Sequence, residues 1–396
     1  MKRIGAISWK ILKWTLLSIL GIFILANLFI VISGKTYIYK AVACTYLVGQ
    51  SGPGIRDLDY FPKREVEQGT PEPWPTHSSY GKVELSPTAL QKFNQYKSTS
   101  LLVFKNDSLL FEHYAEDFGP TTISNSFSVA KSIVSILVGI AIDEHKIKSV
   151  DQPVGDFIPA FREGSRSKLT LYHLLTMSAG LDWSESGGNP LSSNAEAYYG
   201  SDLLSMINSV EVVSEPGKVF DYQSGATLIL GYCVEKATNT KLSYYASEKL
   251  WKKIGAENLA YWSLDAEDGI EKSYCCFYAA GRDFARFGKL YLHQGEWNGT
   301  QIVSSEWVKK STEPADLLDT DGSKNDRYGY CWWITEYNGK KVFYMRGILG
   351  QYVICVPDDN VIIVRTGHKR GDKRNDQPLD LFDYLNAGYE MIESIQ

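Results

Sequence analysis

The sequence predicts an α+β fold: an antiparallel β-sheet flanked by helices, with a mostly helical insertion, preceded by one N-terminal transmembrane helix. Three observations support this prediction. An uncharged apolar run occupies residues 14–32, a strand hairpin followed by an apolar helix begins near residue 101, and strand-like segments return after residue 328. Because strands come from both ends of this region, one sheet would join them and the segments between would form the insertion.

The composition is that of a folded protein. The chain has 396 residues, 44% of them hydrophobic, with 41 basic against 46 acidic residues and a net charge of −5. These values exclude a disordered or collagen-like chain. The acidic balance argues against nucleic acid as a partner, because neutralising phosphates needs a basic surface. The first 40 residues hold six of the basic residues and no acidic one, so the rest carries 35 basic against 46 acidic residues.

The first predicted element is a membrane anchor. As a helix, the 19 residues of the run 14–32 would cover about 28 Å, close to the ~30 Å hydrocarbon core of a bilayer. Four basic residues precede the run and only Lys35 and Lys40 follow closely. This bias predicts a single-pass inner-membrane protein with a cytoplasmic N-terminus and a periplasmic body, residues 1–33 being cytoplasmic segment and anchor. A cleaved signal peptide and a buried core helix are the alternatives.

Residues 34–97 are predicted to form an extended arm. Prolines interrupt them repeatedly and the apolar periodicity is poor, which disfavours long helices. Such an arm either is a flexible spacer or wraps the following domain, and the sequence leaves both possibilities open.

Residues 98–396 are predicted to form the main domain. Leu101–Phe104 and Leu109–Phe111, separated by Lys105-Asn106-Asp107, are typical of a hairpin. Apolar residues at intervals of three and four from Val129 to Ala141 predict a helix, and another is expected from Ala226 to Ala237. Late strands and a closing helix complete the pattern; we expect them at Tyr328–Thr335, Val342–Met345, Gln351–Val356, Val361–Thr366 and, for the helix, Leu379–Ile392.

The cysteines and histidines predict no metal site. Neither Cys-x-x-Cys nor His-Glu-x-x-His spacing occurs. Cys233, Cys331 and Cys355 lie in apolar stretches and are expected in the core. The adjacent Cys275 and Cys276 favour neither a mutual bridge nor a metal site.

A Ser-x-x-Lys pattern offers a nucleophile and its activating amine. It occurs at Ser79–Lys82, Ser128–Lys131 and Ser165–Lys168, but only Ser128 and Lys131 open an apolar helix. A spacing of three puts hydroxyl and ammonium on one helix face, where the N-terminal field favours an alkoxide. Partial desolvation would lower the pKa of Lys131 and make it a base. The alternative is a capping serine beside a solvated lysine.

A second candidate base lies on a turn before a helix, in Asp221-Tyr222-Gln223-Ser224-Gly225. Near a lysine, the phenolate of Tyr222 would become accessible. The alternative is a tyrosine that anchors its loop by the hydroxyl.

Taken together, these motifs resemble those of the serine β-lactamase and penicillin-binding-protein superfamily. They are Ser128-Val129-Ala130-Lys131, Tyr222-Gln223-Ser224 and Gly347-Ile348-Leu349-Gly350-Gln351, in the family's order, from about residue 98 to the C-terminus. The stretches 174–181 and 281–288 resemble its class C-like branch. The motifs are most similar to 6-aminohexanoate-dimer hydrolases and family VIII esterases, in which Tyr-x-Ser replaces Tyr-x-Asn.

The resemblance implies a role for each matched residue. Ser128 would be the acylated nucleophile, Lys131 its activating partner, Tyr222 the proton shuttle and Ser224 a support of their network. The backbone N–H groups of Ser128 and Ile348 would form the oxyanion hole, and no metal or cofactor is implied. The candidate substrate-binding residues are Gly347, Gly350, Arg346 and Trp183.

One departure concerns the third motif, usually Lys-Thr-Gly or His-x-Gly in the family but Met345-Arg346-Gly347 here. Met345 offers no charge to a substrate carboxylate, and Arg346 would point to the opposite face of the strand. We therefore expect a membrane-anchored serine hydrolase for small ester or amide substrates. A cell-wall D,D-peptidase or β-lactamase is the first alternative. A non-catalytic binding or sensor domain is the second, although retention of all three nucleophile-network residues argues against it.

Overall fold

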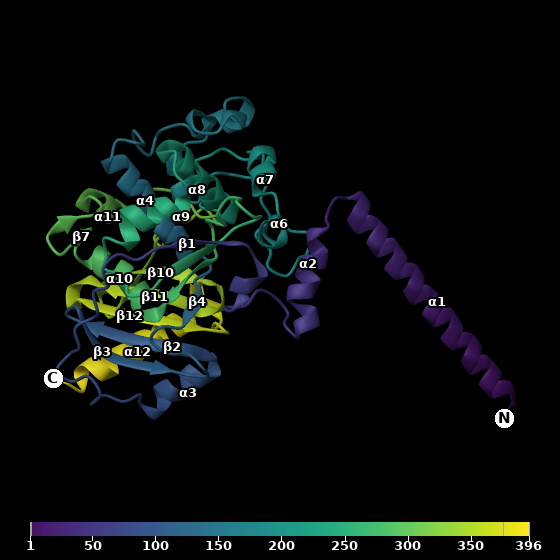
Figure 1. The fold of residues 1–396 in the computed structure, drawn as a ribbon, viewed down its shortest axis with the longest axis horizontal. Coiled ribbons are helices and arrows are strands. Elements are labelled where there is room, and N and C mark those ends of the chain that lie inside the picture. Colours follow the sequence, from purple (N-terminus) through teal and green to yellow (C-terminus); the bar gives the residue numbers. More distant parts are fainter. Residues whose placement is uncertain (1, 375, 396) are drawn as a thin grey trace.

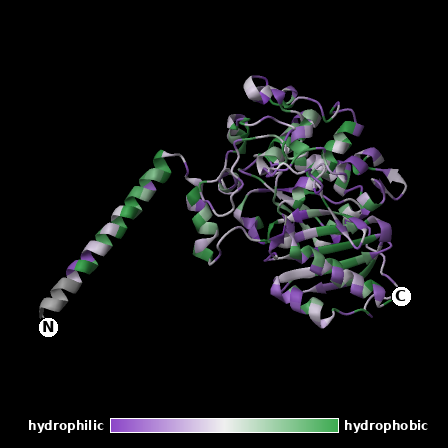
Figure 2. Ribbon diagram, turned by 180° about the vertical axis from the view of Figure 1, so that it is seen from behind, coloured by the Kyte–Doolittle hydropathy of each residue, from purple (hydrophilic) through white to green (hydrophobic). Residues whose placement is uncertain are grey.

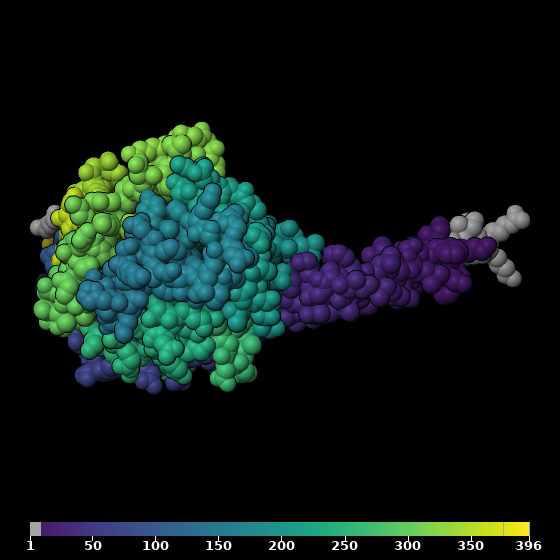
Figure 3. Space-filling view, turned by 90° about the horizontal axis from the view of Figure 1, so that it is seen from above, coloured from purple at the N-terminus to yellow at the C-terminus, as the bar shows by residue number. Residues whose placement is uncertain are grey.

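The structure is a computed structural model that describes residues 2–374 and 376–395. A long helix, α1 (Lys2–Ile32), projects from a compact body that holds the rest of the chain (Figures 1 and 3). Its segment Trp9–Ile32 is, among the described residues, the one helix long and apolar enough to cross a bilayer, and none of its most apolar window is buried. Figure 2 shows hydrophobic residues along most of this helix.

The body is organised around a six-stranded antiparallel sheet in the described part of the chain. Its strands are, in spatial order, β3 (Ser108–Tyr114), β2 (Ser98–Lys105), β12 (Val361–Gly367), β11 (Gln351–Val356), β10 (Lys340–Gly347) and β9 (Trp333–Tyr337). The first two form the predicted hairpin, and its two turn residues, Asn106 and Asp107, both have positive φ, as a tight hairpin turn requires. Strand β12 pairs with β2, so both ends of the domain build one sheet and the predicted α+β fold is confirmed.

Helices cover both faces of this sheet. A Cβ added to Gly288 of α10 (Gly281–Leu292) would meet Ile362, whereas one added to Gly388 of α12 (Leu379–Glu393) would meet Ile363. Since neighbouring residues of a strand point to opposite faces, α10 and α12 lie on opposite sides of β12. The closing helix α12 occupies the predicted span. It covers the sheet face opposite to the helical insertion.

The insertion contains seven further α-helices and, together with one strand from residues 34–97, builds a smaller antiparallel sheet of four strands, counted over the described residues. The helices are α4 (Val129–Asp143), α5 (Leu171–Leu175), α6 (Ser193–Tyr199), α7 (Leu203–Ser209), α8 (Ser224–Thr238), α9 (Leu242–Ala246) and α11 (Ser305–Ser311). The strands are, in spatial order, β1 (Lys63–Val66), β5 (Ala260–Ser263), β6 (Phe277–Ala280) and β4 (Ile123–Asn125). Short two-stranded pairs join β7 (Glu296–Trp297) to β8 (Thr300–Gln301) and β13 (Lys373–Arg374) to β14 (Gln377–Pro378). Helix α4 contacts both β10 and α8, which brings the three sequence motifs together.

Residues 34–97 wrap the domain instead of forming a loose spacer. They contribute β1 to the smaller sheet, and they also form α2 (Tyr37–Cys44) and α3 (Pro87–Gln95). The prolines do not prevent these helices: Pro87 occupies the first turn of α3, where its missing N–H costs nothing, and Ser86 caps that helix through Ala89 N–H (3.1 Å).

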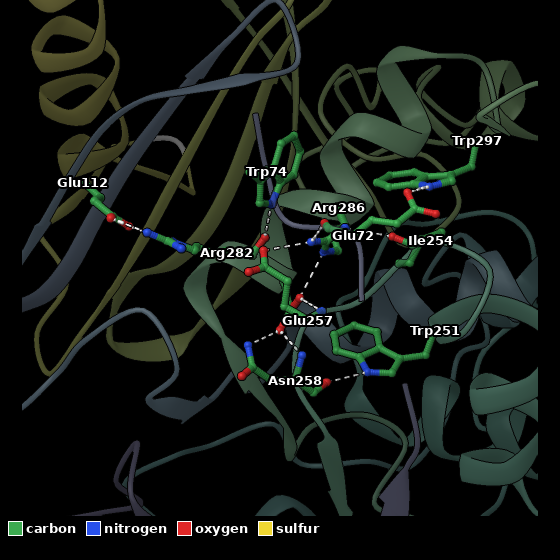
Figure 4. A network of polar contacts seen from close by, with 11 residues as sticks. Glu72, Trp74, Glu112, Trp251, Ile254, Glu257, Asn258, Arg282, Arg286 and Trp297 are labelled. Atoms are coloured by element: carbon green, nitrogen blue, oxygen red, sulfur yellow. Dashed lines mark hydrogen bonds and ion pairs between the residues drawn. The ribbon is translucent and has the colours of Figure 1, made fainter. Parts of the chain in front are cut away.

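A buried polar network holds the arm against the domain (Figure 4). The guanidinium of Arg286 donates to the carbonyl oxygens of Glu72 (2.6 Å) and Ile254 (3.0 Å) and to the carboxylate of Glu257 (2.9 Å). The indole of Trp74 donates to the carbonyl of Arg282 (2.9 Å). Because Arg286 is buried, removing the arm would leave its guanidinium without one acceptor.

The predicted strand at Tyr328–Thr335 is partly wrong. Strand β9 begins only at Trp333, because Cys331 has a φ of +61°, which no extended strand allows. Tyr328 still forms an isolated bridge with Trp333, so the segment folds back onto the edge it was expected to form.

Candidate active site

A tight turn presents Ser128 at the start of α4. The residue before it, Phe127, has a φ of +47°, a left-handed conformation that a bulky residue adopts only when its surroundings enforce it. Here Asn125 enforces it, because its side-chain oxygen accepts the N–H of Phe127 (2.9 Å). The turn leaves Ser128 partly exposed while its neighbours are buried.

Lys131 lies one helical turn further on and is buried, with 1% of its surface exposed. Its Nζ donates to Ser128 Oγ (2.9 Å), to Ser224 Oγ (3.0 Å) and to the carbonyl oxygen of Tyr274 (2.9 Å). Burial lowers the pKa of Lys131 to about 8, and the charge of Glu185 opposes that shift. A substantial fraction of the amine is therefore neutral in mildly alkaline solution, as a general base requires.

Tyr222 reaches the same point from the turn before α8. Its ring centroid lies 5.0 Å from Lys131 Nζ, and the ring packs against Trp333 at 5.5 Å. Burial raises the pKa of the Tyr222 hydroxyl, as does the charge of Glu185, while a hydrogen-bonding interaction with Ser128 and the charge of Arg346 act in the opposite direction. This direction is opposite to the accessible phenolate expected from the sequence, because desolvation outweighs the neighbouring positive charges. A neutral Tyr222 can donate its phenolic proton, and its oxygen can accept a hydrogen bond.

Glu185 completes the network and was not anticipated from the sequence. Its carboxylate accepts two hydrogen bonds from Ser224, one from Oγ (2.6 Å) and one from the backbone N–H (2.7 Å). Since Ser224 Oγ accepts from Lys131, the carboxylate is connected to the amine through one hydroxyl. The only sequence signal was an acidic residue two positions after Trp183; a loop residue has no periodicity that would show where it points.

The network opens into a cavity of about 530 Å³. The nucleophile and shuttle candidates lie on its wall together with three residues of the third motif, Arg346, Gly347 and Ile348. Ser128 and Ile348, whose amides are the predicted oxyanion donors, therefore line the same cavity.

The alternation of side chains along β10 places the positive charge of Arg346 in the cavity. Met345 is completely buried in the core, while Arg346 lines the cavity, stacked over Trp333 with its guanidinium 3.3 Å from the ring centroid. Its Nη1 donates to the carbonyl oxygen of Asp376 (2.7 Å). Arg370 and Lys373 lie on the same wall. The expectation that Arg346 would point away from the substrate was therefore wrong: the face opposite to Met345 is the cavity face.

Two predicted substrate-binding residues lie elsewhere. Trp183 is not among the residues that line the cavity; it is buried against Gly225, where an added Cβ would come within 2.5 Å of the indole. Gly350 has a φ of +83°, and an added Cβ would lie 2.2 Å from Nη1 of Arg365. Both residues pack behind the motifs, outside the lining of this cavity, and their roles in substrate binding stay predictions.

The structure also corrects the prediction for the two adjacent cysteines. Cys275 and Cys276 form a disulfide, and Cys276 has a φ of +65°. Cys275 lines the cavity directly after Tyr274, whose carbonyl binds Lys131. The positive φ at Cys276 turns the backbone there, next to the bond between the two side chains. The other four cysteines are free and buried, as expected for three of them.

The remaining Ser-x-x-Lys pairs form no comparable site. Lys82 and Lys168 are both exposed, and Lys82 Nζ donates to the carbonyl of Ser78 (3.0 Å). Over residues 2–374 and 376–395, no group of three or more His, Cys, Asp or Glu side chains is arranged to hold a metal ion.

Comparisons with known proteins agree with this architecture. The 6-aminohexanoate-dimer hydrolase of Paenarthrobacter ureafaciens is 26% identical over 297 residues, which are 70% of this chain and 74% of that protein. Among solved structures, a proposed 6-aminohexanoate-dimer hydrolase from Bacillus anthracis superposes with a TM-score of 0.72 at 22% identity, covering 85% of this chain and 91% of that one. A family VIII carboxylesterase superposes with a TM-score of 0.60 at 16% identity, covering 78% and 98%.

The sequence profile of the family named Beta-lactamase matches residues 88–385. That range contains all three motifs and all six strands of the large sheet. The members of this family are serine hydrolases, and their fold is the one described above. Because the match covers well over half of the sequence and the structure reproduces the fold, the chain belongs to the beta-lactamase family.

Proposed function

We propose that this protein is a membrane-anchored serine hydrolase that cleaves small ester or amide substrates through an acyl-enzyme on Ser128. The observation that carries the proposal is the contact of Ser128 Oγ with a buried amine, Lys131 Nζ, at 2.9 Å. A pKa of about 8 for that amine allows it to accept the serine proton near neutral pH. The 6-aminohexanoate-dimer hydrolase relative supports an amide or ester specificity.

The proposed reaction has two steps. In the first, neutral Lys131 takes the proton of Ser128 and Oγ attacks the substrate carbonyl. Tyr222 then donates its phenolic proton to the departing alcohol or amine and regains a proton from Lys131. The amides of Ser128 and Ile348 would stabilise the negative oxygen of the intermediate. In the second step, water attacks the acyl-enzyme and the same proton path works in reverse.

The anchor and the compartment belong to the same proposal. The exposed apolar segment Trp9–Ile32 supports a single membrane span, and the charge bias across it supports a cytoplasmic N-terminus with a periplasmic catalytic domain. The Cys275–Cys276 disulfide is consistent with that placement, since disulfides persist mainly in oxidising compartments.

A second candidate function has an observation in its favour. Arg346, Arg370 and Lys373 give one wall of the cavity a positive character, which suits the carboxylate of a penicillin or of a D-Ala-D-Ala peptide. Arg346 is, however, engaged with Asp376. We therefore rank a D,D-peptidase or β-lactamase activity second, and expect a chromogenic cephalosporin to be turned over poorly. Efficient turnover would reverse the order of the two proposals.

The central test uses the full-length protein in detergent with a short p-nitrophenyl ester. Ser128→Ala should reduce kcat/KM by about 10³-fold or more, because the nucleophile is lost. Ser165→Ala, which alters an exposed serine of the same Ser-x-x-Lys pattern, is the matched control and should be unaffected. A fluorophosphonate probe should label only the peptide that contains Ser128. Equal turnover by Ser128→Ala, or labelling of another serine, would reject Ser128 as the nucleophile, whereas no turnover by the wild type would favour the non-catalytic alternative.

A further inference from the structure

The segment that follows the candidate membrane span is unusually apolar for an exposed surface. We call Tyr39–Val48, the part of the chain from the middle of α2 to its following turn, the apolar shoulder. Its most exposed apolar side chains are Tyr39 (43%), Val42 (37%), Tyr46 (70%), Leu47 (77%) and Val48 (49%). No acidic residue occurs before Asp57, whereas Lys35, Lys40 and Arg56 are basic. An exposed apolar surface without carboxylates suits contact with a lipid layer that contains anionic headgroups.

The apolar shoulder lies beside the end of α1 and not beyond it. The hydroxyl of Tyr39 donates to the side-chain oxygen of Asn27 (2.8 Å). Asn27 precedes the last residue of α1 by five positions, a distance of about 7.5 Å along the helix axis. Figure 1 shows α1 leaving the body at this place, with α2 between it and α6. If α1 spans a bilayer, Tyr39 lies at the headgroup level, where tyrosine is enriched.

The apolar shoulder is also a wall of the catalytic cavity. Ala41, Thr45 and Tyr46 line the same space as Ser128 and Ile348. A hydrogen bond at the start of α2 connects this helix to the domain: the hydroxyl of Tyr37 donates to the carbonyl oxygen of Pro190 (3.1 Å). One short segment therefore has one side toward Ser128 and another exposed next to the anchor.

From this arrangement we propose that the cavity opens at the bilayer surface and that the substrate is an amphiphile resident in the membrane, an ester or amide with a long apolar chain. Its chain would remain in the lipid layer along the apolar shoulder while the scissile carbonyl reaches Ser128. This proposal rests on the proposed hydrolase function and specifies the substrate class of the same site. A substrate that diffuses in water has no need of an apolar cavity wall continuous with the anchor.

The experiment compares two esters of p-nitrophenol with the full-length protein reconstituted in phosphatidylcholine–phosphatidylglycerol vesicles. The butyrate ester is soluble, whereas the palmitate ester is held in the vesicles. Leu47→Asp should lower the rate on palmitate about tenfold, because a carboxylate in place of a leucine weakens the contact of the apolar shoulder with lipid, and leave the rate on butyrate unchanged. Val213→Asp is the matched control: Val213 is an apolar residue of similar exposure (68%) outside the cavity lining, and its substitution should change neither rate.

A second measurement locates the apolar shoulder independently of activity. The four free cysteines are buried, so a nitroxide can be attached selectively to Leu47→Cys or Val213→Cys. The label at position 47 should be relaxed preferentially by oxygen, which concentrates in lipid, and that at position 213 by a water-soluble nickel chelate.

The outcomes separate this proposal from the one on which it rests. Hydrolysis of neither ester would reject the hydrolase function itself. Hydrolysis of butyrate with equal palmitate rates for wild type and Leu47→Asp would overturn the membrane-substrate proposal alone. If Leu47→Asp lowers both rates, the nitroxide decides, and exposure of position 47 to nickel overturns the proposal. Loss of self-association in Leu47→Asp, with palmitate turnover unchanged, would show that a second copy of the chain covers the apolar shoulder. That result would also overturn the membrane-substrate proposal.

Discussion

At the scale of single residues, the protonation of Lys131 is the property that governs the proposed chemistry. The amine is buried with three hydrogen-bond acceptors around it but no carboxylate in direct contact. Desolvation therefore outweighs the distant charge of Glu185 and holds the pKa at about 8. This balance between burial and one indirect carboxylate leads to two predictions.

The first prediction is a pH–rate profile with a single rising limb. Because the base is the neutral amine, kcat/KM on an uncharged ester should increase about tenfold per pH unit below the pKa and level off above a pH of about 8. Steady-state rates between pH 6 and 10 measure it. A profile that is flat through this range would show that Lys131 is not the base.

The second prediction concerns Glu185→Gln. The charge of Glu185 raises the pKa of Lys131, so its removal should move the rising limb to lower pH, by about one unit or less. Glutamine keeps an acceptor for Ser224, which separates the charge from the hydrogen bond. Asp182→Asn is the control: Asp182 is exposed and accepts the N–H of Glu211 (2.8 Å), so the profile should stay in place. A shift of the limb to higher pH in Glu185→Gln would contradict the electrostatic role.

A third residue-scale prediction tests the disulfide. Under denaturing but non-reducing conditions, iodoacetamide should modify four cysteines, because Cys275 and Cys276 are bonded to each other. After reduction it should modify six. Intact-mass measurement distinguishes the two products, and six modifications without reduction would show that the pair is a dithiol.

At the scale of elements, the turn between β10 and β11 shows how a buried side chain shapes the site from behind. Arg365 of β12 donates to the carbonyl oxygens of Leu349 (2.6 Å) and Gly350 (2.6 Å), and to that of Tyr96 in the arm (2.6 Å). These bonds fix the turn that carries Ile348. Gly350 leaves the space for the guanidinium, which accounts for the glycine without any contact to substrate.

Gly350→Ala should therefore destabilise the protein by about 2–4 kcal/mol, from left-handed strain and from overpacking against Arg365. Gly322→Ala is a matched control, because Gly322 has a φ of +85° but nothing within 4 Å of an added Cβ; it should cost only about 1 kcal/mol. Thermal unfolding of both variants measures the difference. Equal losses of stability would mean that Arg365 moves aside without cost.

At the scale of the whole molecule, the arm is part of the folded domain and the anchor is not. Residues 63–66 pair with β5, and the backbone carbonyl of Glu72 accepts a hydrogen bond from the guanidinium of Arg286. By contrast, the segment Trp9–Ile32 buries none of its most apolar window in the body.

Two truncations should separate these roles. Deleting residues 1–33 should leave the unfolding temperature of the body unchanged. Deleting residues 1–84 should lower it by about 5 °C or more, because it removes a strand of the smaller sheet and leaves the buried guanidinium of Arg286 without one acceptor, which by itself costs about 1–3 kcal/mol. Differential scanning calorimetry compares them, and equal unfolding temperatures would identify the arm as a spacer.

How much of the fold could be predicted from the sequence depends on how local each feature is in the chain. The hairpin at residues 98–114, strand β11 and the closing helix followed from alternation, turn residues and periodicity, which involve neighbours in the chain. The start of β9 was missed because it depends on the φ of Cys331. The helix at Pro87 was missed because proline was taken as a breaker where the first turn tolerates it.

For the site, the sequence alone determined the partners that lie on one helix: a spacing of three brings Ser128 and Lys131 into contact wherever α4 is placed. Only the tertiary structure decided the rest. Glu185, the Tyr274 carbonyl, the cavity-facing Arg346 and the apolar shoulder come from loops and strands far apart in sequence. Their positions depend on how loops close and on which strand face is covered, and neither residue spacing nor composition contains that information.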